Sequence, residues 1–132
     1  MVSSIKKLKI SFVLPTYNER KNIVRLIRKL LKINNFYKIK IIVVDDNSSD
    51  GTSDIVRSLA QKEIKIRLVK RIGRFGLSSA IKEGCLNSTN EIIAIMDTDG
   101  QHQVEDVINA IEKLSLENLD IVSGSRFLSN SK

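Results

Sequence analysis

Two pairs of acidic residues, each at the end of an apolar run, are the side chains of this chain best suited to chemistry. Asp97 and Asp99 end one such run, and Asp45 and Asp46 end another. Carboxylates packed together raise each other's pKa values, so they persist most easily when a cation neutralises them. Hard oxygen ligands at an i, i+2 spacing suit Mg²⁺ or Mn²⁺, which typically bind one or two protein carboxylates plus substrate phosphates. Asp97 and Asp99 are therefore predicted to clamp a metal–diphosphate.

Asp45 and Asp46 lead into a segment of turn-forming residues, Asn-Ser-Ser-Asp-Gly at 47–51. A turn followed by a helix cap explains that segment well, but it does not explain two adjacent acids. One of the two carboxylates is a candidate acceptor for the N–H donors of a nucleobase. The interpretation of both acids as part of a plain turn stays open.

Other polar side chains follow the remaining apolar runs. Gln101 and His102 come after the 97–99 motif, and His102 is the only histidine of the chain. An ordinary turn histidine is a commoner role for it than a general base. Arg126, Arg71 and Arg74 are candidate partners of a phosphate or diphosphate, with a solvated arginine as the alternative for each.

The elements that must position these residues alternate between strand and helix patterns. The first strand is predicted to close at Pro15, and Asn18 is predicted to cap the first helix. The run at 39–44 is predicted to be a strand covered on both faces, and the run at 92–96 is predicted to be a fourth buried strand. Strands are predicted at 8–14, 39–44, 64–69, 92–96 and from 121–122, with helices at 19–32, around Ile55, Val56 and Leu59, at 77–86 and at 104–116.

Strands separated by single helices imply right-handed crossovers and a mainly parallel sheet with helices on both faces. Ligands of such sheets bind beyond the carboxyl ends of the strands, so the acidic residues are expected to converge on one edge. A length of 132 residues suits a single domain, residues 1–132.

The net charge of +7 is distributed unevenly along the chain. Residues 1–40 contain eleven Lys and Arg and one acid, Glu19. A basic face attracts nucleic acid, an anionic membrane surface or a phosphorylated substrate, although a solvated helix face is an equally common outcome. We formulate the hypothesis that the first predicted helix faces anionic lipid, with Arg20, Lys21, Arg25, Arg28, Lys29 and Lys32 as its cations.

The compartment is expected to be reducing, because Cys85 is the only cysteine and no intramolecular disulfide can form. No segment approaches the ~20 apolar residues of a membrane span, and the first nine residues lack the apolar core of a signal peptide. The chain is therefore expected to be cytoplasmic, with peripheral contact at the cytoplasmic face of a membrane.

Taken in order, these motifs resemble the inverting glycosyltransferases of family 2, and within it the dolichol-phosphate (polyprenol-phosphate) mannosyltransferases. The similar blocks are Leu-Pro-Thr-Tyr-Asn-Glu at 14–19, Val-Val-Asp-Asp-Asn-Ser-Ser-Asp-Gly-Thr at 43–52, Gly-Leu at 76–77 and Ser-Gly-Ser-Arg-Phe at 123–127. Together they cover nearly the whole chain. The resemblance implies an α/β fold of the GT-A (Rossmann-like) type, of which this chain would be the nucleotide-sugar-binding half, C-terminally truncated relative to the family.

The resemblance also implies roles for individual residues. Metal binding and catalysis would fall to the 97–99 motif together with an arginine, and nucleotide binding to the ends of the first two strands. The nucleotide pocket would be lined by Pro15, Tyr17 and Glu19, and Asp46 would hold the base with Asp45 close by. The divalent metal would be bound by Asp97 and Asp99. Thr98 and Gln101 would lie beside the metal and the sugar, and Arg126 would contact phosphate.

The activity implied by the resemblance is transfer of mannose from GDP-mannose to a polyprenol or dolichol phosphate, with inversion and with help from Mg²⁺ or Mn²⁺. An anionic acceptor phosphate needs little from a general base, whereas the departing diphosphate needs electrostatic stabilisation. No nucleic-acid partner is implied. Thr98 stands where mannosyltransferases commonly have Ala, and Gln-His-Gln at 101–103 differs from their usual Ser-His-His, which weakens the choice of sugar and base.

Two alternatives to this activity stay open. One is a catalytically inactive donor-binding module that depends on a second polypeptide for the acceptor half, and the other is a family 2 enzyme that uses a UDP-sugar. Unrelated folds are disfavoured. A receiver domain would carry its acid pair after the first strand and a lysine where Arg126 stands, and a dinucleotide-binding domain would show Gly-x-Gly-x-x-Gly after the first strand.

Overall fold

The structure is a computed structural model that describes residues 7–73, 76–99, 103–118 and 120. The chain divides into two compact units, Met1–Gln101 and His102–Lys132. The first unit contains a parallel four-stranded sheet with helices, and the second contains α4 (Val104–Leu116). The predicted α/β class with a mainly parallel sheet is confirmed.

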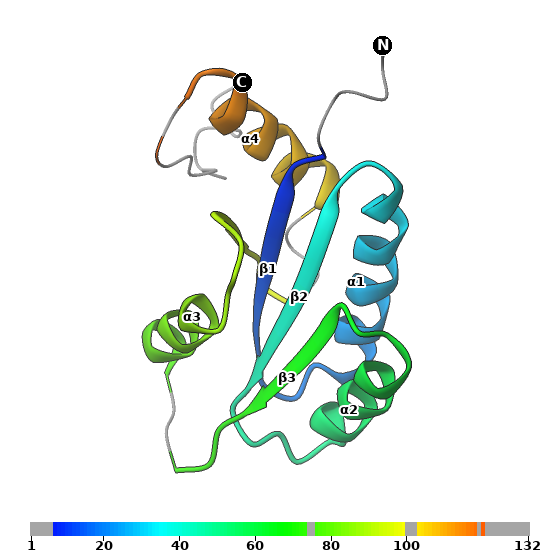
Figure 1. Cartoon of the computed structure of the whole chain (residues 1–132). Helices are drawn as coiled ribbons and strands as arrows, with labels where there is room; N and C mark the ends of the chain where they lie inside the picture. The colour runs from blue at the N-terminus through cyan, green and yellow to red at the C-terminus, as the bar shows by residue number, and fades with distance from the viewer. Residues whose placement is uncertain (1–6, 74–75, 100–102, 119, 121–132) are drawn as a thin grey trace, which may run out of the picture. The chain divides into compact units, whose positions relative to one another are not determined.

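The sheet has the order β3-β2-β1-β4, and all its strands run in the same direction. Figure 1 shows β1, β2 and β3 side by side, and the hydrogen-bonded order places β4 on the other side of β1. The strands are β1 (Lys9–Thr16), β2 (Lys38–Asp45), β3 (Ile66–Lys70) and β4 (Ile92–Ile95), and the helices of this unit are α1 (Arg20–Lys32) with the 3₁₀ turn η2 (Ile33–Asn35), α2 (Thr52–Lys62) and α3 (Leu77–Leu86).

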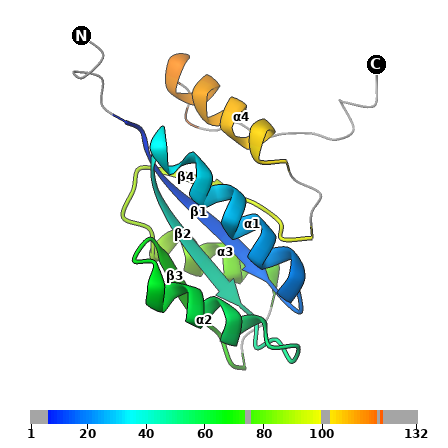
Figure 2. The ribbon, with the colours of Figure 1, turned by 90° about the vertical axis from the view of Figure 1, so that its right-hand side faces the viewer.

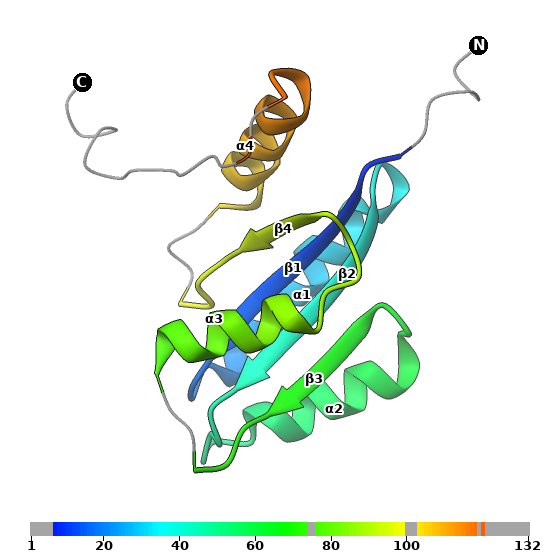
Figure 3. The same ribbon diagram turned by 60° about the vertical axis from the view of Figure 1, so that its left-hand side comes forward.

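Helices α1 and α2 lie on one face of the sheet, and α3 lies on the other, as the two rotated views show (Figures 2 and 3). The chain steps from β1 to β2 to β3 in one direction and then returns to place β4 beside β1. Right-handed crossovers put the helix of the returning step on the opposite face. The strand order therefore reverses between β1 and β4, which is where open α/β sheets bind ligands.

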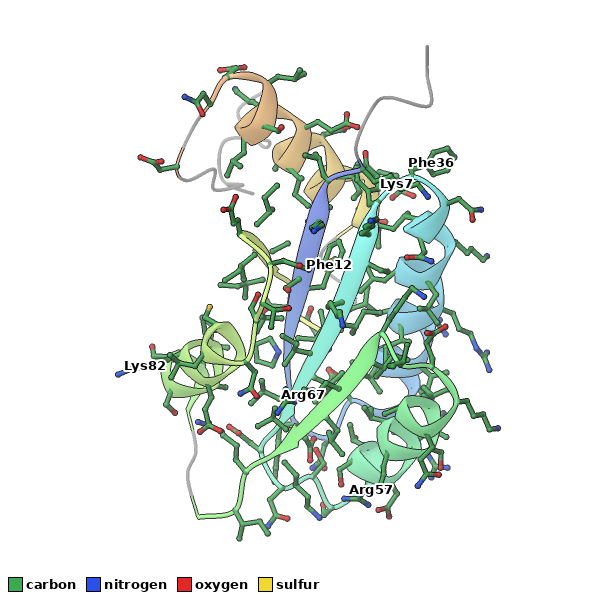
Figure 4. All side chains as sticks on the ribbon, viewed as in Figure 1. Lys7, Phe12, Phe36, Arg57, Arg67 and Lys82 are labelled. Atoms are coloured by element: carbon green, nitrogen blue, oxygen red, sulfur yellow. The ribbon has the colours of Figure 1, made fainter. Side chains whose placement is uncertain are left out.

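The core is divided by the alternation of side chains along each strand. Val13 of β1 faces α3, where it belongs to a cluster with Ile42, Val44 and Ala80. Its neighbour Phe12, labelled in Figure 4, faces the other layer and is fully buried. That layer is closed by the buried residues of α1: Ile23, Leu26, Ile27 and Leu30.

Helix α3 approaches the sheet closely because one of its residues is a glycine. A Cβ atom built on Gly84 would lie 2.3 Å from the Cγ1 atom of Val13, far inside van der Waals contact. Only a residue without a side chain allows the helix backbone to lie at this distance from β1. Gly84 thus fixes how deeply α3 packs on β1 and β2.

Several predicted boundaries are corrected by the structure. Pro15 does not close the first strand, since β1 continues to Thr16 and Pro15 pairs with Val44 of β2. The third strand begins at Ile66 rather than at Ile64. The helices predicted at 77–86 and 104–116 are confirmed residue for residue, and the predicted strand at 121–122 lies outside the described residues.

The prediction that the fourth strand is buried is wrong for one face of β4, as far as its residues are described. Ile93 and Ile95 of β4 are 37% and 42% exposed, while Ala94 between them is buried. The physical reason is the position of α3, which packs on β1 and β2 and leaves that face of β4 open. An apolar run alone does not reveal which of its faces has a covering helix.

Candidate functional site

The polar ends of the strands form one continuous edge of the sheet. The backbone ladder extends past the strand ends, because the N–H of Asp46 donates to the carbonyl of Thr16 at 3.1 Å. In the same way the N–H of Arg71 donates to the carbonyl of Asp45 at 2.8 Å. The first residues after β2 and β3 are therefore held by the sheet itself, which brings Asp46 and Arg71 to the same edge.

The 97–99 motif begins two residues after β4, beside the end of β1 where the strand order reverses. Thr98, only 5% exposed, is its anchor. The Oγ1 atom of Thr98 lies 3.3 Å from both the carbonyl oxygen of Pro15 and the Oγ1 of Thr16. With its centre tied to β1, the motif presents a half-buried Asp97 and an exposed Asp99 at this point.

These two carboxylates fit a divalent cation that arrives with its substrate. Among the described residues, no group of three or more His, Cys, Asp and Glu side chains gathers to hold a metal ion. A closed structural metal site is thus not formed there, whereas Mg²⁺ and Mn²⁺ commonly use one or two carboxylates and complete their shell with phosphates and water. Gln101, His102 and Arg126, predicted to lie nearby, fall outside the described residues.

Asp45 is used inside the turn that follows β2. Its side chain is fully buried, and its carboxylate accepts hydrogen bonds from the N–H of Ser48 at 3.0 Å and from the hydroxyl of Ser48 at 2.5 Å. Both oxygens therefore shape the turn, in agreement with the turn interpretation for this residue. A contact between Asp45 and a nucleobase stays a prediction.

Asn18 has a different role from the predicted helix cap. Glu19 is the N-cap of α1, and Asn18 adopts a left-handed conformation with φ of 52°. Its N–H donates to the hydroxyl of Ser48 at 2.8 Å, and its Oδ1 accepts from the N–H of Ser49 at 2.9 Å. The hydrogen bonds of Asn18 thus link the loop after β1 to the loop after β2. The prediction that Asn18 caps α1 is wrong.

A second link between the same two loops runs through Asp50. Its carboxylate accepts from the hydroxyl and N–H of Thr52 and from the N–H of Arg20, the last at 3.2 Å. The Thr52 hydroxyl, ahead of the backbone N–H donors, holds the pKa of Asp50 below its ordinary value. The carboxylate is therefore ionised at neutral pH and holds the start of α1 beside the start of α2.

The three residues predicted to line a nucleotide pocket share the end of β1. Pro15 is half-buried within the strand, and Glu19 is half-buried where it accepts a hydrogen bond from the Asn22 amide at 3.3 Å. Tyr17 between them is 57% exposed. The hydrogen-bonded loops hold this aromatic ring at the edge of the sheet, where it can pack against a ligand.

Asp46 is bound by a buried arginine, a contact that the sequence reasoning missed. Arg71 is 1% exposed and donates to both carboxylate oxygens of Asp46, from Nε at 2.6 Å and from Nη2 at 3.0 Å. Its remaining donors go to Ser79 and to the carbonyl of Gly76. The hydrogen bond with Asp46 raises the pKa of Arg71, so the guanidinium stays charged. The prediction that Arg71 binds phosphate is therefore wrong, because its donors are used within the protein.

One signal in the sequence would have revealed this pair. The carboxyl ends of neighbouring parallel strands meet at the same edge, so an arginine directly after β3 must lie close to acids directly after β2. Elsewhere on the first unit, a shallow depression of about 390 Å³ lies between α2 and β3. None of the predicted site residues lines it.

Comparison with known proteins agrees with this geometry. Residues 11–132 match the family model described as glycosyl transferase family 2. Over 95% of its length the chain is 33% identical to a dolichol-phosphate mannosyltransferase of Pyrococcus furiosus, and over 93% it is 33% identical to a dolichyl-phosphate β-glucosyltransferase of Trichomonas vaginalis. Among solved structures, a mannosyltransferase from Pyrobaculum calidifontis in complex with GDP-Man and Mn²⁺ superposes with a TM-score of 0.71 and 28% identity over 83% of the chain.

The matched proteins are considerably longer than this chain. The chain spans 35% and 41% of the two relatives and 33% of the mannosyltransferase structure. The similarity therefore concerns one part of each of these proteins. That part contains the parallel sheet and the edge at which the acidic strand ends meet.

Proposed function

Because the chain belongs to glycosyl transferase family 2, we propose that its first compact unit binds a nucleotide-sugar donor, GDP-mannose, together with Mg²⁺ or Mn²⁺. The observation that carries this proposal is the position of Asp97 and Asp99 beside β1, where the strand order reverses. A structural relative bound to GDP-Man and Mn²⁺ supports the choice of ligand and the class of metal. When bound, the divalent ion would neutralise charge on the diphosphate.

The strand-end residues divide into two groups in this proposal. The nucleoside side lies at the ends of β1 and β2 and consists of Asp46, Tyr17, Pro15 and Glu19. The exposed Tyr17 ring offers a stacking surface, and Asp46 offers a hydrogen-bond acceptor.

On the diphosphate side, Asp97 and Asp99 would hold the metal, and Thr98 would fix their position. Gln101 and Arg126, which lie outside the described residues, are proposed to complete this side.

The reaction we propose is transfer of the sugar to a polyprenol or dolichol phosphate with inversion. The names of the two relatives, a mannosyl- and a glucosyltransferase of dolichol phosphate, support this acceptor class. An attacking phosphate oxygen is already anionic, so the chain's residues would mainly orient the donor and stabilise the departing diphosphate. The relatives differ in their sugar, and a UDP-sugar donor is the alternative to GDP-mannose.

A second candidate function is donor binding without transfer. It is favoured by one observation: the chain spans only 33% to 41% of the length of these matched proteins. The acceptor side would then come from a further part of the same protein or from a second polypeptide. Donor binding draws mainly on residues of the first unit and is the part of the proposal that the chain can be tested for directly.

A calorimetric titration tests the donor site. We expect GDP-mannose to bind the chain with measurable heat in the presence of Mn²⁺ and at least about tenfold more weakly when the metal is removed by a chelator, because the diphosphate is then unneutralised. UDP-glucose titrated under the same conditions decides between the two donor classes. A folded chain that gives no heat with either donor would contradict the proposal.

We further propose that the face of α1 turned away from the core contacts an anionic membrane surface. This face carries four cations at the helical spacing i, i+4, i+7 and i+11: Lys21, Arg25, Arg28 and Lys32. They lie opposite the buried residues of the helix. All four are exposed, and in the described part of the chain no ion pair neutralises any of them. In the same part of the chain, no helix is both long and apolar enough to cross a bilayer.

Charge reversal of this face is expected to abolish binding to anionic vesicles. Each cation near such a surface contributes about 1 kcal/mol, so changing Lys21, Arg25, Arg28 and Lys32 to Glu should lower vesicle partitioning at least a hundredfold. The measurement is sedimentation with phosphatidylserine-containing liposomes. A control with the same net charge carries Glu at four other exposed cations, Lys38, Lys40, Lys62 and Arg67. Equal loss in both variants would show a non-specific charge effect and refute the assigned face.

A further inference from the structure

The buried arginine at the end of β3 gives Asp46 a fixed orientation. We propose that Arg71 is a positioning residue for the donor: it holds the Asp46 carboxylate in the plane required to recognise a nucleobase edge and links that carboxylate to the start of α3. This inference rests on the proposed function and assigns base recognition to a pair of residues rather than to Asp46 alone.

The geometry of the pair fixes the plane of the carboxylate. Nε and Nη2 of Arg71 each donate to a different oxygen of Asp46, at 2.6 and 3.0 Å. Two parallel N–H···O bonds between planar groups restrain rotation about the last side-chain bond, which a single bond would leave free. The Asp46 side chain retains 14% exposure. An ionised carboxylate offers about four lone-pair sites, so those not used by Arg71 remain for the N–H donors of a base.

Arg71 itself is held from the other side by α3. Its Nη1 donates to the hydroxyl of Ser79 at 2.8 Å and lies 3.8 Å from the Oε1 of Glu83. Its Nη2 also donates to the carbonyl of Gly76, the N-cap residue of α3, at 3.0 Å. The guanidinium therefore joins the ends of β2 and β3 to the first turns of α3, and Asp46 cannot change its orientation without breaking these contacts.

A purely stabilising role is a poor explanation for this arrangement. Removing an arginine and a carboxylate from water is expensive, and an apolar pair of similar volume is often as stable or more so. What the charged pair adds is a defined geometry, here at the edge where the strand-end acids meet. The same geometry explains why this arginine, unlike Arg67 earlier in β3, is 1% exposed rather than solvated.

The test separates base recognition from diphosphate binding. GDP, UDP and pyrophosphate, each with Mn²⁺, are titrated into the wild-type chain and into Arg71→Lys and Asp46→Asn. We expect both variants to lose at least about tenfold in affinity for the preferred nucleotide and to lose the preference between GDP and UDP. Pyrophosphate, which lacks a base, should bind them as it binds the wild type. The double variant should bind the nucleotide no more weakly than either single one, because both changes remove the same oriented carboxylate.

A matched control and a milder variant complete the test. Arg67→Lys makes the same chemical change at an exposed arginine of β3, labelled in Figure 4, and should leave all three affinities unchanged. Ser79→Ala removes one support of the guanidinium and should weaken nucleotide binding partially, which keeps the proposal testable if Arg71→Lys does not fold.

Two results would overturn the assignment, and they differ from each other. If pyrophosphate affinity falls in parallel with nucleotide affinity, Arg71 supports the sheet edge in general and not the base. If the variants keep wild-type affinity and preference for nucleotides, the pair has no part in recognition while the proposed donor site stands. A wild-type chain that binds no nucleotide contradicts the proposed function first, and the role of Arg71 with it.

Discussion

Replacing Asp97 and Asp99 together by asparagine is expected to lower Mn²⁺-dependent affinity for GDP-mannose at least a hundredfold. The substitution keeps the size of both side chains and removes both charges that would hold the cation, an interaction that contributes several kcal/mol to binding of a metal–diphosphate. Thr98, which anchors the motif to β1, is unchanged, so the backbone should keep its position. Calorimetry with and without Mn²⁺ measures the loss.

The control for this variant removes the same number of charges elsewhere. Glu105→Gln with Asp106→Asn changes two exposed acids in the first turn of α4 and should leave donor affinity as it is. Thermal unfolding of both variants should stay close to the wild type. Retained metal-dependent binding in Asp97→Asn/Asp99→Asn would mean that the cation is bound by other groups, and the position assigned to the diphosphate would be wrong.

Gly84→Ala is expected to destabilise the chain by about 1–2 kcal/mol. The added methyl group would meet Val13 at 2.3 Å, so helix or strand must shift, and overpacking of this kind costs about 1–3 kcal/mol. The higher helix propensity of alanine returns up to about 1 kcal/mol. Urea unfolding followed by circular dichroism measures the difference in the free energy of unfolding.

A double-mutant cycle identifies the cause of this destabilisation. Val13→Ala removes the methyl group that the side chain added by Gly84→Ala would strike, so the two substitutions together should cost less than the sum of their separate effects by about 1 kcal/mol. Lys82→Ala, on the exposed side of the same helix (Figure 4), should be close to neutral. Strict additivity of the two core substitutions would show that α3 does not pack on Val13 as described.

Much of the fold follows from local patterns in the sequence. The β-branched run of β2 and the helical spacing in α3 and α4 are predicted correctly. A strand covered on both faces leaves a continuous apolar run, and a helix buried on one face leaves a periodic one. The convergence of the acidic strand ends also follows, since strands joined by single helices must be parallel. The exposure of Ile93 and Ile95 does not follow, because it depends on where α3 lies and not on β4 itself.

The site is predictable in its composition but less so in its contacts. Asp97 and Asp99 stand out as a spaced pair of hard ligands after an apolar run. Asp45 and Asp46 look equivalent in the sequence, and the structure separates them: one shapes a turn through Ser48, the other pairs with Arg71. Asn18 has the composition of a helix cap, but its backbone takes the left-handed conformation that lets it bridge two loops. Such distinctions depend on contacts between residues far apart in the chain.

The reversal of strand order has a consequence for how the site comes into being. The hydrogen bond from Thr98 to Pro15 joins residues 83 positions apart, and the pairing of β1 with β4 is the most distant in sequence among the described strands. Contacts with such long loops form slowly during folding, because the loop entropy must be overcome before they add stability. The acidic motif can therefore reach its working position only when the last described strand has joined the sheet. A bound metal–nucleotide would then stabilise only chains whose sheet is complete, and its protection against unfolding would report how far folding has gone.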